Sequence, residues 1–406
     1  MSDPFDLSGE TRIIESNIRN VFTPHQPIDS VDFFFGRSEE VKKVIETLNT
    51  PGLHFLLYGE RGVGKSSLGN IAVKLLIEIL YKDCTFVKRC DKQTTVEEIF
   101  EKPLSSVGVN VYELSSVTKE TSGICGGFDL KVVKLTGSDG QEKQITYRAN
   151  TISPSYISEK LLSKRGVIFI DEFDALKQET KEKVGELIKL LSDEKSPFKL
   201  LIVGVGNNII DLLSGNASNN RHVKQIKLSR MKPEQISEII NKGSVKINLK
   251  YEKDVVEKIT DIAAGYPHFA HLLALKSGEN AIRQNLKVVT NELLVQSINE
   301  SLQDTEELLQ QAWSSTMNSL QSELYLQILI VCASITSNEI RANQLRAGLK
   351  RMFGINYEQN VLNQYLTRLV SDDENKILHR ISKGIYRFSD PRMSSFVKIK
   401  AIGYKK

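Results

Sequence analysis

Glycines, a lysine and a hydroxyl group stand at a spacing that could bind phosphate. The stretch consists of Gly59, Glu60, Arg61, Gly62, Val63, Gly64, Lys65, Ser66 and Ser67. It follows the apolar run Leu53–Tyr58 and precedes a segment from Leu68 to Leu80 whose apolar residues recur with a helical period. Glycines allow a tight turn whose successive N–H groups point at phosphate oxygens. A helix that begins there adds the positive end of its dipole. A buried strand, such a loop and a helix are the context that a phosphate-binding P-loop requires.

Two side chains of this loop have expected roles. Lys65 would reach the β- and γ-phosphates, and the Ser66 hydroxyl would ligate Mg²⁺. The alternative is a glycine-rich turn that only links strand to helix, which the strand and helix on either side disfavour. The sequence therefore predicts that the chain binds a nucleoside triphosphate at Gly59–Ser67.

A second candidate site is the end of the apolar run Gly166–Ile170, where Asp171 and Glu172 follow. A continuous apolar run is typical of a strand buried in a parallel sheet. In a P-loop protein, Asp171 would hold Mg²⁺ directly or through water, and Glu172 would orient or polarise the attacking water. Such a run is common alone, and its place downstream of the P-loop is what supports this interpretation.

Polar residues also flank two later apolar segments. Asn207 follows the run Lys199–Val205 and would position water beside the γ-phosphate, although an asparagine after glycine is also ordinary turn chemistry. Arg221 precedes the predicted strand Val223–Leu228. It could reach the γ-phosphate of a neighbouring subunit, where such a residue can be worth ~10³–10⁵ in rate, or it could be a solvated arginine.

Composition bounds the class of protein. The chain has 406 residues, of which 40% are hydrophobic and 26% charged, as in an ordinary soluble protein of two or three domains. No apolar run approaches the ~18 residues needed to cross a bilayer, so no membrane partner is expected. Residues 1–6 show no secretory signal pattern. The four cysteines lack C-x-x-C spacing, which favours a reducing cytoplasm over zinc or disulfides.

Strands alternate with helices from about residue 31 to residue 230, which predicts an α/β domain with a mostly parallel sheet. Within it, the glycine-punctuated residues 107–150 predict a β-hairpin insertion, either a partner or substrate contact or a solvated decoration. Residues 1–30 are an N-terminal extension in which Pro24 and Pro27 favour an extended connector. Residues 231–315 predict a helical domain, with helices at Pro233–Asn241, Glu252–Ala264, Pro267–Asn285 and Asn291–Gln311.

Residues 316–406 have a different order. The pattern predicts helices at Ser322–Ala333, Asn338–Met352 and Glu358–Val370, then short strands at Ile377–Ile381 and Ile385–Phe388, which together describe a winged helix. From Asn318 onward, fourteen lysines and arginines against seven acidic residues give a net charge of +7, leaving −3 for the rest of a chain of net charge +4. Such a domain could bind DNA through the phosphate backbone or pack on protein surfaces.

The assembled chain resembles AAA+ ATPases, in the branch shared by origin-recognition-type replication initiators and STAND signalling ATPases. Gly59–Ser66 matches the family's Walker A motif, and Val167–Glu172 matches Walker B. The resemblance implies that Phe35-Gly36-Arg37 lies near the adenine, with Gly36 and Arg37 at the nucleotide. It further implies a sensor 1 role for Asn207 and an arginine-finger role for Arg221.

The predicted helical domain resembles the AAA+ lid, with one departure. Initiators commonly carry an arginine early in the helix after Gly265, whereas this chain reads Gly-Tyr-Pro-His-Phe-Ala-His. The stretch is more similar to the GxP motif of STAND proteins, which implies that Pro267 packs near the base. Ordinary lid packing is the alternative to a sensor role for His268 or His271.

These features favour an ATP-driven switch that binds ATP, hydrolyses it with Mg²⁺, and changes its domain arrangement or assembly with nucleotide state. The expected partner is another copy of the chain or a second protein, bound through the ATPase domain. Two alternatives stay open. One is a DNA-binding initiator or loader that acts through the winged helix, and the other is a nucleotide-dependent scaffold with negligible hydrolysis.

Overall fold

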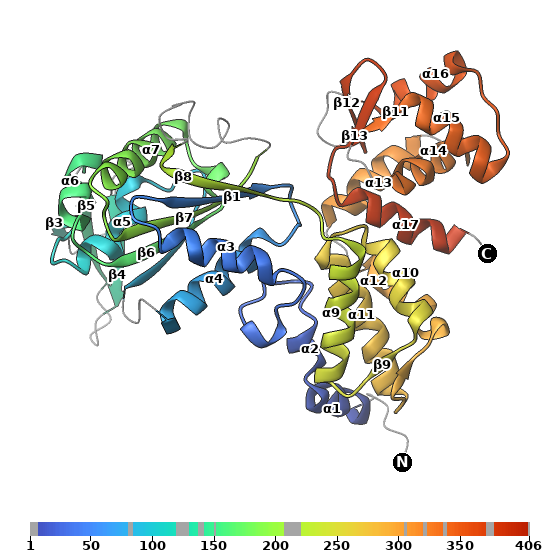
Figure 1. Cartoon of the computed structure of the whole chain (residues 1–406), viewed down its shortest axis with the longest axis horizontal. Coiled ribbons are helices and arrows are strands. Elements are labelled where there is room, and N and C mark those ends of the chain that lie inside the picture. The colour runs from blue at the N-terminus through green and yellow to red at the C-terminus, as the bar shows by residue number, and fades with distance from the viewer. Residues whose placement is uncertain are drawn as a thin grey trace. The chain divides into compact units, whose positions relative to one another are not determined.

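The computed structural model of the chain describes residues 7–79, 84–118, 130–136, 142–149, 152–206, 221–303, 307–319, 323–335, 339–370 and 377–404 (Figure 1). It divides into two compact units. The α/β unit comprises Glu39–Gly59 and Leu68–Leu228. The helical unit comprises Met1–Ser38, Glu60–Ser67 and Ser229–Lys406. Among the described residues, no helix has the length and apolarity that a bilayer span would need.

The α/β unit is organised around a parallel five-stranded sheet with the order β2-β6-β7-β1-β8. Its strands are β1 (His54–Gly59), β2 (Thr85–Arg89), β6 (Gly166–Asp171), β7 (Phe198–Val205) and β8 (Val223–Leu228). All of β6 and nearly all of β7 are buried, which explains their continuous apolar sequences. The α/β fold predicted from the sequence is confirmed.

Helix α3 (Ser38–Leu48) precedes β1. Helices also lie between strands of the sheet, as parallel pairing requires, and they are α4 (Lys65–Ile79), α5 (Val96–Ser105), α6 (Pro154–Leu161) and α7 (Gln178–Asp193). The hydroxyl of Thr95 accepts the Glu98 N–H at 3.4 Å and caps α5. Helix α6 was missed by sequence reasoning, although Ser153 caps it and Pro154 occupies its first turn.

A second, antiparallel sheet of order β3-β5-β4 lies within residues 107–150. Strands β4 (Leu130–Thr136) and β5 (Glu142–Ala149) pair where the hairpin is predicted. Strand β3 (Tyr112–Thr118) pairs with the other edge of β5 and was not predicted. A partner contact through this sheet stays a prediction.

Among the described residues after β8, the helical unit contains five successive helices, α9 (Pro233–Lys246), α10 (Lys253–Ala263), α11 (Pro267–Arg283), α12 (Asn291–Gln303) and α13 (Glu307–Ser319). The predicted helix Asn291–Gln311 is described as α12 and α13, and residues 304–306 lie outside the described part. Two short strands, β9 (Lys250–Tyr251) and β10 (Val288–Val289), pair in parallel between these helices.

The last part of the helical unit has the order helix, strand, two helices, two strands and helix. Its elements are α14 (Glu323–Ser334), β11 (Ile340–Arg341), α15 (Ala342–Phe353), α16 (Gln359–Leu369), β12 (Leu378–Ser382), β13 (Ile385–Phe388) and α17 (Met393–Tyr404). The strands form an antiparallel sheet of order β11-β13-β12. Strand β11 and helix α17 were not predicted. Trp313 packs edge-on against Phe396, which holds α17 on α13.

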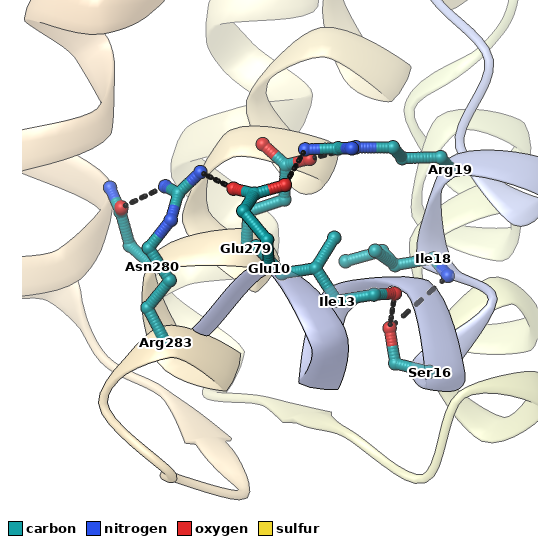
Figure 2. Close-up of polar contacts among 8 residues, drawn as sticks. All are labelled: Glu10, Ile13, Ser16, Ile18, Arg19, Glu279, Asn280 and Arg283. Carbon is teal, nitrogen blue, oxygen red and sulfur yellow. Dashed lines mark hydrogen bonds and ion pairs between the residues drawn. The ribbon is translucent and has the colours of Figure 1, made fainter. Parts of the chain in front are cut away.

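Helices α1 (Leu7–Ser16) and α2 (Ile18–Val21) precede the predicted connector and were not anticipated. Figure 2 shows the charged side chains that join them to α11. Glu10 is bonded to Arg19 at 3.1 Å and to Arg283 at 2.8 Å. Arg19 Nε also donates to the buried Glu279 carboxylate at 2.6 Å. The N-terminal segment is therefore an integral part of the helical unit.

Candidate nucleotide-binding site

Three strands of the parallel sheet end at the same edge. Gly59 at the end of β1 pairs with Val205 at the end of β7, and Asp171 ends β6 on the other side of β7. Ligands of open α/β sheets bind at the carboxyl ends of the strands. Gly59 itself has a positive φ of 149°, and the Leu228 carbonyl oxygen occupies the space of a side chain there. Glycine is therefore required where the phosphate-binding loop begins.

The loop after β1 adopts the conformation that its glycines permit. Gly62 and Gly64 have φ values of 83° and 93°, which L-residues with side chains rarely adopt. Lys65 begins α4, and its Nζ donates to the Glu60 carbonyl oxygen at 2.7 Å. Arg61 is exposed, while Val63 is buried and anchors the loop. The backbone can thus present N–H groups at the start of a helix, as phosphate binding requires.

The loop residues Glu60–Ser67 belong to the helical unit, and other residues of the same unit lie directly against them. A side chain at Gly64 would meet Pro267 Cγ at 3.6 Å, so the proline predicted to pack near a base is a neighbour of the loop. Ser67 Oγ accepts the Ile28 N–H at 3.1 Å. His268 Nδ1 bonds to the Pro24 carbonyl oxygen at 2.8 Å. The first turn of α11 and the segment that follows α2 therefore belong to the surroundings of the loop.

His271 is a packing residue of α11. Its Nδ1 accepts the Thr23 N–H at 3.2 Å, and its ring stands edge-on to Phe22. Burial lowers the pKa of His271 to about 4, so its imidazole is neutral at pH 7. These contacts join α11 to the N-terminal segment.

Gly36 and Arg37 are anchored to the segment that follows β8. A side chain at Gly36, whose φ is 80°, would meet the Gln235 carbonyl oxygen at 2.8 Å. Gln235 Nε2 donates to the Gly36 carbonyl oxygen at 2.6 Å. The Arg37 side chain is buried, and its Nη2 donates to the Ser229 carbonyl oxygen at 2.6 Å. Their proximity to a base stays a prediction.

The acid pair stands at the end of β6 with its two side chains in different environments. Asp171 is buried, and its Oδ1 accepts the Glu172 N–H at 3.0 Å. Glu172 is exposed and has left-handed backbone angles, with φ 56° and ψ 36°. Such a conformation is unfavourable for a residue with a side chain and is found at functional sites. It turns the chain away from the strand direction immediately after Asp171.

Asp174 supports this edge of the sheet and was not singled out from the sequence. Its Oδ1 accepts the Val205 N–H at 2.7 Å, which joins the turn after β6 to the end of β7. Lys181 Nζ donates to the Asp174 carbonyl oxygen at 2.8 Å and holds the turn on α7. The signal that could have found it is the third acid of the sequence Asp-Glu-Phe-Asp.

The donor groups suit magnesium. Mg²⁺ takes oxygen ligands and usually only one or two from protein, with water and phosphate oxygens completing its shell. The Ser66 hydroxyl and the Asp171 carboxylate are oxygen donors of this kind. Within the described ranges, no group of three His, Cys, Asp or Glu side chains could hold a metal by itself. Ser66 and Asp171 are therefore chemically suited to Mg²⁺.

Asn207 lies outside the described residues, and its expected role is untested. Arg221 precedes the first residue of β8, at the edge of the sheet opposite Gly59 and Asp171. The strand between them spans about 20 Å at ~3.3 Å per residue. Arg221 Nε donates to His222 Nε2 at 2.9 Å, and 68% of its side chain is exposed. This position separates Arg221 from the edge that carries the acid pair of the same chain.

A family model decides the class. The model, described as nSTAND1, Novel STAND NTPase 1, matches residues 23–381. The chain belongs to this family. This confirms the STAND part of the resemblance found in the sequence. As a STAND NTPase, the chain is a nucleotide-driven switch.

Other comparisons add less. No functionally curated protein matches the chain. Among solved structures, the Aeropyrum pernix ORC2 protein in ADPNP–ADP complexes is 14% identical, with 95% of this chain and 96% of that chain covered and a TM-score of 0.49. Cdc6p from Pyrobaculum aerophilum is 16% identical, with coverage of 95% and 98% and a TM-score of 0.43. The Thermotoga maritima RuvB Holliday junction branch migration motor is 18% identical, with coverage of 88% and 94% and a TM-score of 0.42. Likenesses this low carry no argument about activity or partners.

Proposed function

We propose that this STAND NTPase binds ATP and hydrolyses it with Mg²⁺. The observation that carries the proposal is the loop from Gly59 to Ser66, whose glycines have positive φ and whose last two residues open a helix after a buried parallel strand. This geometry suits the phosphates of a nucleotide. The base would lie toward Gly36, Arg37 and Pro267, as the family resemblance implies.

Each side chain then has one task. Lys65 would contact the β- and γ-phosphates, and Ser66 and Asp171 would hold Mg²⁺, which when bound neutralises charge on the phosphates. Glu172, which is exposed beside the buried Asp171, would accept a proton from the attacking water or orient it. Asn207 would hold the same water.

The test compares hydrolysis with binding. Glu172→Gln should lower ATP turnover by about 10²–10⁴-fold, the usual contribution of a general base, while leaving ATP affinity intact. Glu186→Gln on α7 removes an exposed charge of the same type and is the matched control. Wild-type protein without turnover at any concentration would instead support the nucleotide-dependent scaffold.

Assembly is proposed to complete the site. Arg221 is exposed at the sheet edge opposite the acid pair, which supports a role on the γ-phosphate of a neighbouring copy. Turnover per chain should then rise with protein concentration, and Arg221→Ala should abolish that rise. A turnover per chain that is independent of concentration would contradict an action between subunits.

DNA binding is a second candidate function, because the hairpin of β12 and β13, which is the predicted wing, is basic. Arg380, Lys383 and Arg387 are all exposed on β12, β13 and the turn between them. The order of helices and strands around them supports the predicted winged helix. Binding to duplex DNA should weaken steeply with salt and should be lost in Arg380→Glu combined with Arg387→Glu.

The cytoplasmic location is also proposed, supported by free thiols at Cys84, Cys90 and Cys332.

A further inference from the structure

Glu60 follows Gly59 in the phosphate-binding loop and is bonded to two side chains from distant parts of the helical unit. Its Oε2 accepts from Tyr266 Oη at 2.9 Å and from Arg230 Nε at 3.2 Å. Only 20% of the Glu60 side chain and 18% of the Arg230 side chain are exposed, and Tyr266 is fully buried. A single carboxylate oxygen thus receives two donors in a site with little water.

The two donors are themselves fixed. The Arg230 guanidinium lies over the Tyr266 ring, with 4.7 Å from its carbon to the ring centre, and its Nε bonds to the carboxylate. Burial raises the pKa of the Tyr266 phenol, which therefore keeps its proton and donates it. The Met231 N–H also donates to the Gly265 carbonyl oxygen at 2.9 Å, which joins the two segments that carry Arg230 and Tyr266.

The main chain of the same glutamate contacts the lysine of the loop. Lys65 Nζ donates to the Glu60 carbonyl oxygen at 2.7 Å, and Lys65 is 7% exposed. An ammonium group has three donors, so the Lys65 amine can bond to more than one acceptor at a time. A lysine amine on a flexible four-carbon stem gains a defined direction from such a bond.

We propose that Glu60 is a positioning residue for Lys65. Its carboxylate, held by Arg230 and Tyr266, fixes the peptide group whose carbonyl oxygen orients the lysine amine toward the nucleotide phosphates. The inference rests on the proposed function, because that function gives Lys65 a phosphate to contact. Tyr266, which immediately precedes α11, is therefore linked to Lys65 through two hydrogen bonds of Glu60, one to its carboxylate and one to its carbonyl oxygen.

The test is a double-mutant cycle in the full chain, measured as affinity for a fluorescent, slowly hydrolysed ATP analogue. Glu60→Ala should weaken binding about tenfold in the wild-type background but less than about twofold in Lys65→Ala, because the lysine through which it acts is gone. Glu60→Gln keeps an acceptor for both donors and should restore most of the affinity. Glu234→Ala, an exposed glutamate in the first turn of α9, is the charge-matched control.

AMP supplies a second measurement if Lys65→Ala binds the analogue too weakly for the cycle. Because AMP lacks the phosphates that Lys65 reaches, Glu60→Ala should leave AMP affinity unchanged while it weakens the ATP analogue. Equal losses in both backgrounds, or for both ligands, would overturn the proposal and make Glu60 only a structural anchor of the loop. A wild-type chain that does not bind the analogue would overturn the proposed function itself.

Discussion

The side chain of Arg392 lies against Gly62, so the start of α17 packs on the middle of the phosphate-binding loop. A methyl group at Gly62 would come within 2.8 Å of Arg392 Cδ and 3.1 Å of Cγ. Arg392 is buried and bonded twice to Asp390, from Nε to Oδ1 at 3.1 Å and from Nη2 to Oδ2 at 2.7 Å. The stem of this arginine therefore cannot move away from the loop without breaking a paired contact.

Gly62→Ala should weaken ATP binding and lower stability. The substitution forces a methyl group into the space of Arg392 and places an L-residue at a φ of 83°, and the backbone cost alone is about 1–2 kcal/mol. Isothermal titration with ATP and a thermal melt measure the two effects. Gly354→Ala is the matched control, because Gly354 has a φ of 69° with nothing within 4 Å of the added methyl. The Gly354→Ala protein should be less stable but should bind ATP with unchanged affinity. A Gly62→Ala protein that binds ATP like the wild type would contradict the packing of Arg392 on the loop.

Asp390→Ala should destabilise the helical unit, because it removes the carboxylate that makes two bonds to the buried Arg392 guanidinium. Removing one partner of a buried pair costs about 3–5 kcal/mol, and the 25% exposure of Asp390 places this pair toward the lower figure. The midpoint of thermal unfolding measures the loss. Asp390→Ala combined with Arg392→Met should recover stability, because the buried positive charge is removed as well. A double variant no more stable than Asp390→Ala would show that the pair is not the cause.

The phosphate-binding loop and the acid pair could be predicted because their signals are local. The runs that became β1 and β6 are continuous and apolar, and each motif follows its strand directly. The partners of Glu60 are separated from it by 170 and 206 residues, and nothing in the sequence near Arg230 or Tyr266 points to the loop. Contacts of this kind depend on the folded chain.

The missed elements have a related cause. Helix α17 contains valine, isoleucine and glycine, which are weak helix formers, and its burial rather than its propensity stabilises it. In the N-terminal segment, only the prolines gave a prediction, that of an extended connector. Helices α1 and α2 could not be predicted in this way, because they depend on charged contacts with α11. Gly278 on α11 shows the dependence, since the side chain of Ile18 occupies the space beside it.

Stability should fall as the pH is lowered below the ordinary histidine range, because His54 is buried in its neutral form. Its Nδ1 accepts the Leu200 N–H at 3.0 Å, and burial lowers its pKa from 6.5 to about 3. Between these values the unfolded chain binds a proton that the folded chain does not, so folding loses about 1.4 kcal/mol per pH unit for this group as pH falls. Below about pH 3 this contribution stops changing.

His54→Asn should make stability less sensitive to acid. Asparagine offers an acceptor to Leu200 and does not titrate, so the slope of unfolding free energy between pH 6 and pH 4 should decrease by about 1.4 kcal/mol per unit. Urea unfolding at a series of pH values, followed by a probe of the α/β unit, gives the slope. His25→Asn, in the turn after α2, is the control and should leave it unchanged. An unaltered slope in His54→Asn would show that other groups determine the acid sensitivity.

Arg19→Met should loosen the N-terminal helices from α11, because it leaves Glu279 without this arginine (Figure 2). The Glu279 side chain is only 4% exposed, whereas 51% of the Arg19 side chain is exposed, so solvent replaces part of the lost contact and the cost is about 1–2 kcal/mol. Proteolysis of the N-terminal segment and thermal unfolding both report the change. Arg346→Met, at an exposed arginine of α15, controls for the loss of charge. Adding Glu279→Gln should reduce the cost, because a neutral amide is easier to bury than an unpaired carboxylate. If the Arg19→Met protein resists proteolysis as well as the Arg346→Met control does, apolar packing alone holds α1 and α2 in place.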